Sequence, residues 1–485
     1  MNATGTDPKR WQALALVCVA FFMTVLDVSI VNVALPSIKN SLHVSDTTVQ
    51  WVLIAYTITF GGFLLLGGRA ADLLGRRRMF IVGVALFSIA SLVCGLASSI
   101  GVLVAARAVQ GLGAAIVSPA TLAIITTAFE EGAERNKALG IWGAMGGSGA
   151  AAGVLFGGIL VKYLGWEWIF FVNVPVGALV LALTRPVVRE SRAEGIRGFD
   201  AGGAVTVTAG LALLVYAISK APTVGWSAGR TIGELVGSAV LLAAFVVIES
   251  RHRQPLVPFR IFRTKTLAGA NVASFLLGAV IFANFFVLTL YVQQVLGYSP
   301  LKTGLTFLAT AGTVIPVAGI AQALVTRIGV RPVLTAGLAL VAGAMFWYAQ
   351  VPVDGSYARD LLPGYLMMGV GLAFSFIPVS IAALAGVEYH ESGLASGLLN
   401  TTQQVGGALG VAIASTVAFT HERTLLASGR SLPQAMTSGF ALSFWVLGGV
   451  GVAAVLAAFV LVRSSEVGVE PGEAPAAAYS SPGEA

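Results

Sequence analysis

Long apolar runs separated by short polar segments dominate the pattern of residues along the chain. A helix that crosses a bilayer needs about 20 mostly apolar residues, and fourteen stretches of the sequence meet this requirement. The first stretch follows two basic residues but lacks a small-residue cleavage site, so we interpret it as an uncleaved helix and not as a signal peptide. The predicted helices cover residues 11–35, 49–68, 79–98, 101–127, 138–161, 167–184, 201–219, 232–248, 267–293, 303–326, 332–350, 361–386, 393–419 and 438–462.

The composition excludes a soluble protein. Hydrophobic residues make up 56% of the chain, charged residues only 11%, and the mean hydropathy is +0.87, whereas a soluble domain carries about 25% charged residues. The 58 glycines are typical of close helix packing in lipid. Cys18 and Cys94, the two cysteines, both lie in apolar runs, which indicates buried free thiols and no disulfide scaffold. The sequence therefore predicts an all-α polytopic membrane protein.

The distribution of basic residues predicts the orientation of the helices. An even number of crossings puts both termini on one side of the membrane. Of the 29 Lys and Arg residues, twenty fall on that side, eight fall on the other side, and Arg107 lies within a helix. Because cytoplasmic loops carry an excess of Lys and Arg, we expect both termini in the cytoplasm. This bias also accounts for the net charge of +7 without nucleic acid.

Two long basic loops, at 185–200 and 249–265, divide the helices into groups of six, two and six. We therefore expect an N-terminal six-helix bundle at 1–186, a two-helix linker segment at 187–256 and a C-terminal six-helix bundle at 257–463. The two middle helices have no charged residue deep in the span, so they are expected at the periphery, away from any transport pathway. Residues 464–485 are rich in Glu, Pro, Ala, Gly and Ser, which predicts a disordered cytoplasmic tail.

Asp27 and Arg107 are ionisable residues deep within predicted spans. A charge inside a membrane is costly, so each is a candidate functional residue. Burial penalises the charged form of a carboxylate, which suits Asp27 to carry a proton or to pair with a cationic ligand. Arg107 keeps its charge and must either pair or face water. A purely structural ion pair or helix cap is the alternative interpretation for both residues.

Two further segments, at 67–78 and 149–158, contain several glycines at short spacings. Residues 67–78 join two helices on the side of the termini, and residues 149–158 place small residues four apart on one helix face, which allows a neighbouring backbone to approach closely. The candidate gating residues in these segments are Gly68, Asp72, Gly75, Arg76 and Arg77 in the loop, and Gly149, Gly153, Gly157 and Gly158 in the helix.

These motifs together resemble the fourteen-helix drug:proton antiporter family of the major facilitator superfamily. Residues 27–36 resemble its first-helix signature, 68–77 its loop motif between helices 2 and 3, 103–115 its fourth-helix Arg motif and 149–158 its fifth-helix antiporter motif. The likeness continues through 166–177, 291–300 and 393–407, so it covers nearly the whole chain in order.

The resemblance implies two six-helix bundles that rock about a central cavity and export drugs across the plasma membrane in exchange for protons. It implies that Asp27 binds the proton, that Arg107 modulates Asp27, and that Asp72 and Arg76 help close the cytoplasmic gate. The glycine face of 149–158 would permit rocking against a partner helix. Asn32, Asn284, Asn400 and Gln404 are candidate substrate contacts, with interhelical hydrogen bonds as the alternative role.

The chain departs from the family pattern at three positions: Val154 replaces the usual Pro, and Glu167 and Gln403 stand where Arg is common. No acid lies deep in the C-terminal spans, which disfavours strongly dicationic substrates. An importer or facilitator of a nutrient on the same scaffold is the alternative function. The four histidines lie far apart in loops and form no catalytic or metal cluster, so we expect no enzyme activity, no metal and no cofactor, with protons as the coupling ion. The expected partners are a small-molecule substrate and the bilayer, and the protein is expected to be monomeric.

Overall fold

A computed structural model describes residues 9–129, 133–192, 200–252, 255, 257, 265–384 and 392–463. Throughout these residues the secondary structure is helical. Twelve helical segments are long and apolar enough to cross a membrane, and α6 and α15, with 31 and 36 residues, are long enough as well, which makes fourteen. The elements are α1 Arg10–Ser41, α2 Asp46–Val49, α3 Trp51–Leu74, α4 Arg76–Gly95, α5 Ile100–Ala128, α6 Ala133–Tyr163, α7 Trp168–Phe171, α8 Asn173–Val187, α9 Ala201–Val224, α10 Gly229–Arg251, α11 Lys265–Leu290, η2 Tyr291–Val295, α12 Pro300–Ile328, α13 Val330–Tyr348, η3 Tyr357–Leu361, α14 Leu362–Leu384, α15 Ser392–Ala427 and α16 Leu432–Leu461.

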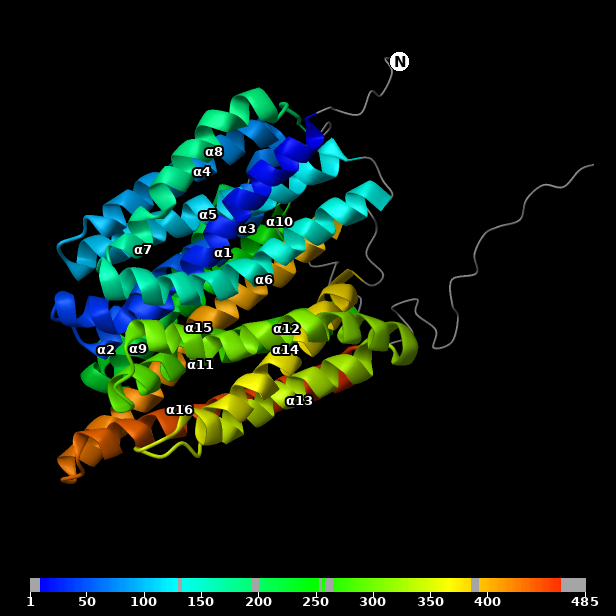
Figure 1. Cartoon of the computed structure of the whole chain (residues 1–485). Helices are drawn as coiled ribbons and strands as arrows, with labels where there is room; N and C mark the ends of the chain where they lie inside the picture. The colour runs from blue at the N-terminus through cyan, green and yellow to red at the C-terminus, as the bar shows by residue number, and fades with distance from the viewer. Residues whose placement is uncertain are drawn as a thin grey trace, which may run out of the picture.

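The long helices run roughly side by side and form two groups (Figure 1). In the first group α3 packs on α5, α1 on α6 and α4 on α5 and α8. In the second group α11 packs on α15 and α16, and α13 on α14 and α16. We call these groups the N-half, α1 to α8, and the C-half, α11 to α16. The halves meet where α6 packs on α12 and α3 on α15.

Both ends of the described chain lie on one side of the helices. Lys9, just before α1, donates to the carbonyl of Pro186 at the end of α8. Arg463, just after α16, donates through its backbone to Thr266 at the start of α11. We call this the terminal side and the opposite one the far side. The tail at 464–485 lies outside the described residues.

α9 and α10, the two helices that lie between the halves in the sequence, differ in the helices they pack against. α9 packs against both α3 and α15, and α10 packs mainly on α9. The hydroxyl of Thr416, on α15, donates to the carbonyl of Ile218 on α9 at 3.4 Å, and the ring of Trp51 on α3 lies 5.9 Å from the ring of Tyr216 on α9. Because α3 and α15 also touch each other directly, α9 covers the seam between the halves. That these helices contribute nothing to a transport pathway stays a prediction.

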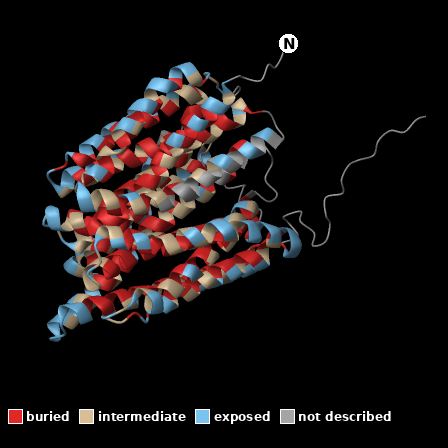
Figure 2. Cartoon of the chain, viewed as in Figure 1, coloured by how far each residue is buried: buried red, intermediate tan, exposed pale blue. Residues whose placement is uncertain are grey.

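Burial follows the packing of the helices. Buried residues lie between the helices, and exposed ones gather on the outer faces and helix ends (Figure 2). One continuous apolar cluster joins the far-side part of α1, at 30–38, to α11 and η2, at 280–292. Exposed apolar side chains such as Ile89, Val240 and Val460 line the outer faces, which fits a surface solvated by lipid.

Candidate functional site

Asp27 on α1 and Arg107 on α5 form an ion pair in the interior of the N-half. Both residues have no exposed surface, and Nη1 of Arg107 lies 2.5 Å from Oδ2 of Asp27. Nε of Arg107 donates to the carbonyl of Val52 on α3 at 3.0 Å. The guanidinium carbon lies 4.2 Å from the ring centroid of Tyr56 and 5.7 Å from that of Phe170. The positive charge is therefore stabilised by a carboxylate and by two aromatic faces.

Two amide side chains that the sequence did not single out complete this site. Nε2 of Gln110, one turn after Arg107 on α5, donates to Oδ1 of Asp27 at 2.8 Å. Nδ2 of Asn173 donates to the same oxygen at 3.0 Å. Asn173 is the first residue of α8, directly after the break that separates α8 from α7. Both amides are buried, so α1, α5 and α8 converge on one carboxylate.

The four glycines of α6 face two different helices. A Cβ atom on Gly153 would lie 2.6 Å from the carbonyl oxygen of Leu26 on α1, and Gly149 and Gly157 also face α1. A Cβ atom on Gly158 would instead lie 2.6 Å from Cα of Leu301 on α12, in the C-half. Glycine is therefore required both beside Asp27 and at the contact between the halves.

Replacing Gly158 with alanine is expected to separate α6 from α12, because the new methyl group would meet backbone atoms that cannot move aside. Overpacking of this kind costs about 1–3 kcal/mol, so the melting temperature of the purified protein in detergent should fall by several degrees. Gly319→Ala on α12 is the matched control, because nothing lies within 4 Å of a Cβ atom there. Equal melting temperatures for both variants would contradict this assignment.

Residues of the loop motif at 67–78 form a network of hydrogen bonds on the terminal side of the N-half. Arg76 donates to Oδ1 of Asp72 through Nε and Nη2, at 3.1 and 2.9 Å. Gly75 has a φ of +113°, which glycine adopts without strain. The backbone N–H of Arg77 donates to Glu190 at 3.1 Å, and a Cβ atom on Gly75 would meet the same carboxylate. Sequence reasoning missed Glu190, because it lies more than 110 residues away from the motif.

Gly67 and Gly68, at the end of α3, lie against α5. A Cβ atom on Gly67 would collide with the carbonyl oxygen of Ala115, and one on Gly68 would lie 3.4 Å from Cβ of Pro119. The close approach of α3 and α5 at the terminal side therefore depends on Gly67.

Three of the four candidate substrate contacts hold a buried amide oxygen that has no hydrogen-bond partner among the described residues. They are Asn32 on α1, Asn284 on α11 and Gln404 on α15. The amide nitrogen of Asn32 donates to the carbonyl of Val28 in its own helix at 2.9 Å. Asn400 is exposed on α15. An unpaired buried acceptor is costly, so these oxygens are suited to accept hydrogen bonds from a bound molecule.

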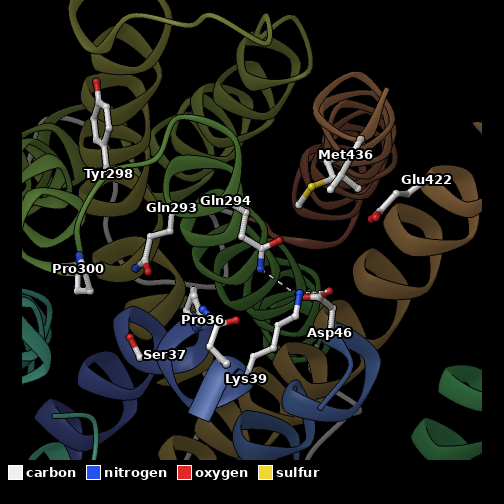
Figure 3. A pocket seen from close by; sticks show the side chains of 12 residues that line it. Pro36, Ser37, Lys39, Asp46, Gln293, Gln294, Tyr298, Pro300, Glu422 and Met436 are labelled. Carbon is white, nitrogen blue, oxygen red and sulfur yellow. Dashed lines mark hydrogen bonds and ion pairs between the residues drawn. The ribbon is translucent and has the colours of Figure 1, made fainter. Parts of the chain in front are cut away.

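A cavity of about 490 Å³ opens on the far side where the two halves meet (Figure 3). Asp46 on α2 pairs with Lys39 of α1 at 2.6 Å and accepts from Nε2 of Gln294 of η2 at 3.1 Å. Gln293 donates to the carbonyl of Val33 on α1 at 2.9 Å. Side-chain hydrogen bonds thus join the N-half to the C-half on the far side.

A buried hydrogen bond also joins the two halves, between α15 and the start of α3. The hydroxyl of Ser415 on α15 donates to the side-chain oxygen of Gln50, next to α3. Together with the apolar cluster that joins α1 to α11, these contacts hold the halves closed on the far side.

Glu422, on the part of α15 beyond the span predicted to end near residue 419, projects into this cavity (Figure 3). Burial raises the pKa of Glu422, the Asp46 carboxylate raises it further, and Lys39 opposes both effects. A raised pKa means that the folded state favours the protonated form of this acid. Folding stability should therefore fall as the pH rises from 4.5, the ordinary value, through the raised pKa of Glu422.

We expect Glu422→Gln to remove this contribution to the pH dependence of stability, because glutamine mimics the protonated form at every pH. Melting temperatures measured in detergent across pH 4 to 8 should converge at acidic pH and separate at neutral pH, with the variant more stable. Parallel curves for parent and variant would show that the Glu422 charge has no effect on the closed far side.

Sequence comparison places the chain among known transporters. Residues 17–411 match the family model of the Major Facilitator Superfamily. The chain is 39% identical over 480 residues to the puromycin resistance protein pur8 of Streptomyces alboniger, which covers 97% of this chain and 95% of that protein. It is 38% identical to the cephamycin export protein CmcT of Amycolatopsis lactamdurans, over 85% of this chain and 86% of that protein.

Solved structures show the same fold. A bacterial homologue of the human lysosomal transporter Spinster superimposes with a TM-score of 0.65 over 95% of this chain and 98% of the other, at 17% sequence identity. The long helices of the described residues, the family match and this shared architecture agree with one another. The chain is a multi-pass membrane transporter and not an enzyme, and it belongs to the Major Facilitator Superfamily.

Proposed function

We propose that this protein exports antibiotics, other drugs or related hydrophobic small molecules across the plasma membrane in exchange for protons. The observation that carries the proposal is the buried pair of Asp27 and Arg107, because an ionisable pair inside a membrane bundle is costly and is retained mainly for function. The relatives named for puromycin resistance and cephamycin export support the substrate class.

Asp27 is the proton carrier in this proposal, and Arg107 is the partner that senses whether the proton is bound. The substrate would lie between the halves, against apolar and aromatic side chains. The unpaired amide oxygens of Asn32, Asn284 and Gln404 support a role in accepting hydrogen bonds from it. Asn400, exposed on the same helix as Gln404, is a further candidate contact.

The transport cycle is alternating access by two rocking domains. Residues 1–186 and 257–463 form the moving bundles, 187–256 the two-helix linker and 464–485 a cytoplasmic tail. The excess of basic residues on the terminal side supports cytoplasmic termini, and the far side then faces outward. The hydrogen bonds of Asp46 and Gln293 across the halves support a state closed to the outside. One monomer contains the complete site.

The energetics set a limit on the export gradient. One charge that moves through 100 mV yields about 2.3 kcal/mol, and one pH unit adds about 1.4 kcal/mol. One proton for each neutral substrate molecule would therefore sustain at most roughly a 500-fold gradient, because each 1.4 kcal/mol is a factor of ten. Such a gradient is large enough to confer resistance.

Efflux from cells and uptake into inside-out vesicles test the proposal together. Cells that express the protein should expel puromycin and a hydrophobic dye, and a protonophore should abolish the expulsion. Inside-out vesicles energised with an acidic lumen should accumulate the same compounds. Accumulation in intact cells, or efflux that a protonophore leaves unchanged, would favour the importer or facilitator instead.

A further inference from the structure

The donors to the Asp27 carboxylate among the described residues are divided unequally between its two oxygens. Each carboxylate oxygen can accept two hydrogen bonds. Oδ1 accepts one from Gln110 at 2.8 Å and one from Asn173 at 3.0 Å, so both of its positions are occupied. Oδ2 accepts one, from Arg107 at 2.5 Å. Two amide donors therefore hold Oδ1, and the guanidinium holds Oδ2.

Ser91 on α4 keeps both amide donors directed at Oδ1. Its hydroxyl accepts the second N–H of Gln110 at 3.2 Å and the second N–H of Asn173 at 3.1 Å. It donates its own hydrogen to the carbonyl of Phe170 at 2.9 Å. Both hydrogens of each amide are thus in use, and the serine hydroxyl makes its full set of three bonds.

Rotation of either amide by a half-turn would be unfavourable. In Gln110 it would turn Oε1 toward the Asp27 carboxylate and would lose the hydrogen bond in which Oε1 accepts from Arg107 at 2.7 Å. In Asn173 it would place the amide oxygen against the carboxylate as well. Because two acceptors repel one another at hydrogen-bond distance, the network holds one orientation.

We propose that Gln110 and Asn173 are positioning residues that direct the incoming proton to Oδ2 of Asp27, so that proton uptake and release of Arg107 become one event. The inference rests on the proposed function of Asp27 as the proton carrier. A proton on Oδ2 makes Oδ1 the carbonyl oxygen, which keeps both amide hydrogen bonds. Oδ2 becomes a hydroxyl, which has lost the negative charge and is a weak acceptor for a guanidinium.

A proton on Oδ1 would have the opposite effect. It would displace one amide donor and would leave Oδ2 as the acceptor for Arg107, so the proton could bind while the contact with Arg107 persisted. In either route the pair changes from neutral to a net positive charge, but only a proton on Oδ2 also removes the carboxylate acceptor of Arg107. That charge is costly to bury, and its cost favours a rearrangement that exposes Arg107 to water. The two amides therefore couple protonation to conformational change.

Asn173→Leu tests this step, because leucine keeps the volume and removes the donor. Asn271→Leu on α11 is the matched control: Asn271 is also buried, and it lies in the C-half, where its Nδ2 donates to the carbonyl of Leu267 at 3.0 Å and its Oδ1 accepts from the hydroxyl of Thr402 at 3.3 Å. In proteoliposomes with an imposed pH gradient, the puromycin gradient sustained by Asn173→Leu should fall at least about tenfold relative to the parent. Puromycin counterflow without a pH gradient should stay within about twofold. Proton leak without puromycin should rise.

Infrared difference spectra give a readout that a merely structural role would not change. The carbonyl band of protonated Asp27, identified by its absence in Asp27→Asn, should shift to higher wavenumber in Asn173→Leu, because Oδ1 loses a hydrogen bond. The pH of half-maximal puromycin exchange should shift with it. Ser91→Ala removes the hydroxyl that holds both amides and its hydrogen bond to the Phe170 carbonyl, but it leaves both donors to Asp27 in place. It should lower the puromycin gradient by a smaller factor, and it carries the test if Asn173→Leu does not fold.

The outcomes separate this inference from the proposed function. If the parent shows no proton-driven export, or if Asp27→Asn exports as the parent does, the proposed function fails. Asn271→Leu is expected to keep the parental puromycin gradient, pH profile and carbonyl band. If the parent is coupled but Asn173→Leu and Ser91→Ala also keep all three, only the role of the amides is overturned.

Discussion

Replacing Asp27 with asparagine is expected to abolish uphill export while the protein still inserts in the membrane. Asparagine keeps the shape of the side chain but cannot bind a proton or neutralise Arg107. The guanidinium keeps its hydrogen bonds to Val52 and Gln110 and its contact with the Tyr56 ring, which limits the loss of stability. The substrate gradient, at most roughly 500-fold for one proton in the parent, should collapse to near unity in proteoliposomes with an imposed pH gradient.

Glu134→Gln is the control for this variant. Glu134 pairs with Arg10 on the terminal side and has a half-exposed side chain, so loss of its charge is expected to leave export unchanged. Undiminished uphill export by Asp27→Asn would refute the role of Asp27 as proton carrier.

Replacing Arg107 with lysine is expected to impair coupling although the charge is conserved. The guanidinium contacts three helices at once, because it donates to Asp27 on α1, to Val52 on α3 and to Gln110 on its own helix α5. A lysine ammonium is a single point donor and cannot reproduce this fork. We expect the sustained gradient to fall by about ten- to a hundredfold, the range of one lost charge-assisted hydrogen bond at about 1.5–3 kcal/mol.

The pH profile of transport distinguishes geometry from charge at this position. Arg230→Lys on α10 is the matched control, because Arg230 pairs with Glu234 on an exposed helix face. If Arg107→Lys transports as the parent does across a pH series, only the positive charge matters, and the planar fork has no role.

The spans and the two charges at the site could be predicted from the sequence for the same reason. A bilayer imposes a length and an apolar composition on each helix, so the fourteen helices stand out as local patterns. Asp27 and Arg107 stand out because each interrupts an apolar run, where a charge is costly. Gln110 and Asn173 are neutral, and a neutral amide in an apolar helix is an ordinary interhelical hydrogen-bonding group. Their sequence context therefore gave no signal of a shared carboxylate.

Local composition by itself determined that this chain is a membrane-spanning bundle, where its helices lie and that Asp27 and Arg107 interrupt two of them. Tertiary packing alone decided that Asp27, Arg107 and Asn173 meet, since 80 residues separate the first two and 146 separate Asp27 from Asn173. It also decided that Gly158 faces the C-half while Gly153 faces α1. Hydropathy depends on each residue and its neighbours along the chain. The number of donors around one oxygen depends on how α1, α4, α5 and α8 pack, and only the folded structure contains that information.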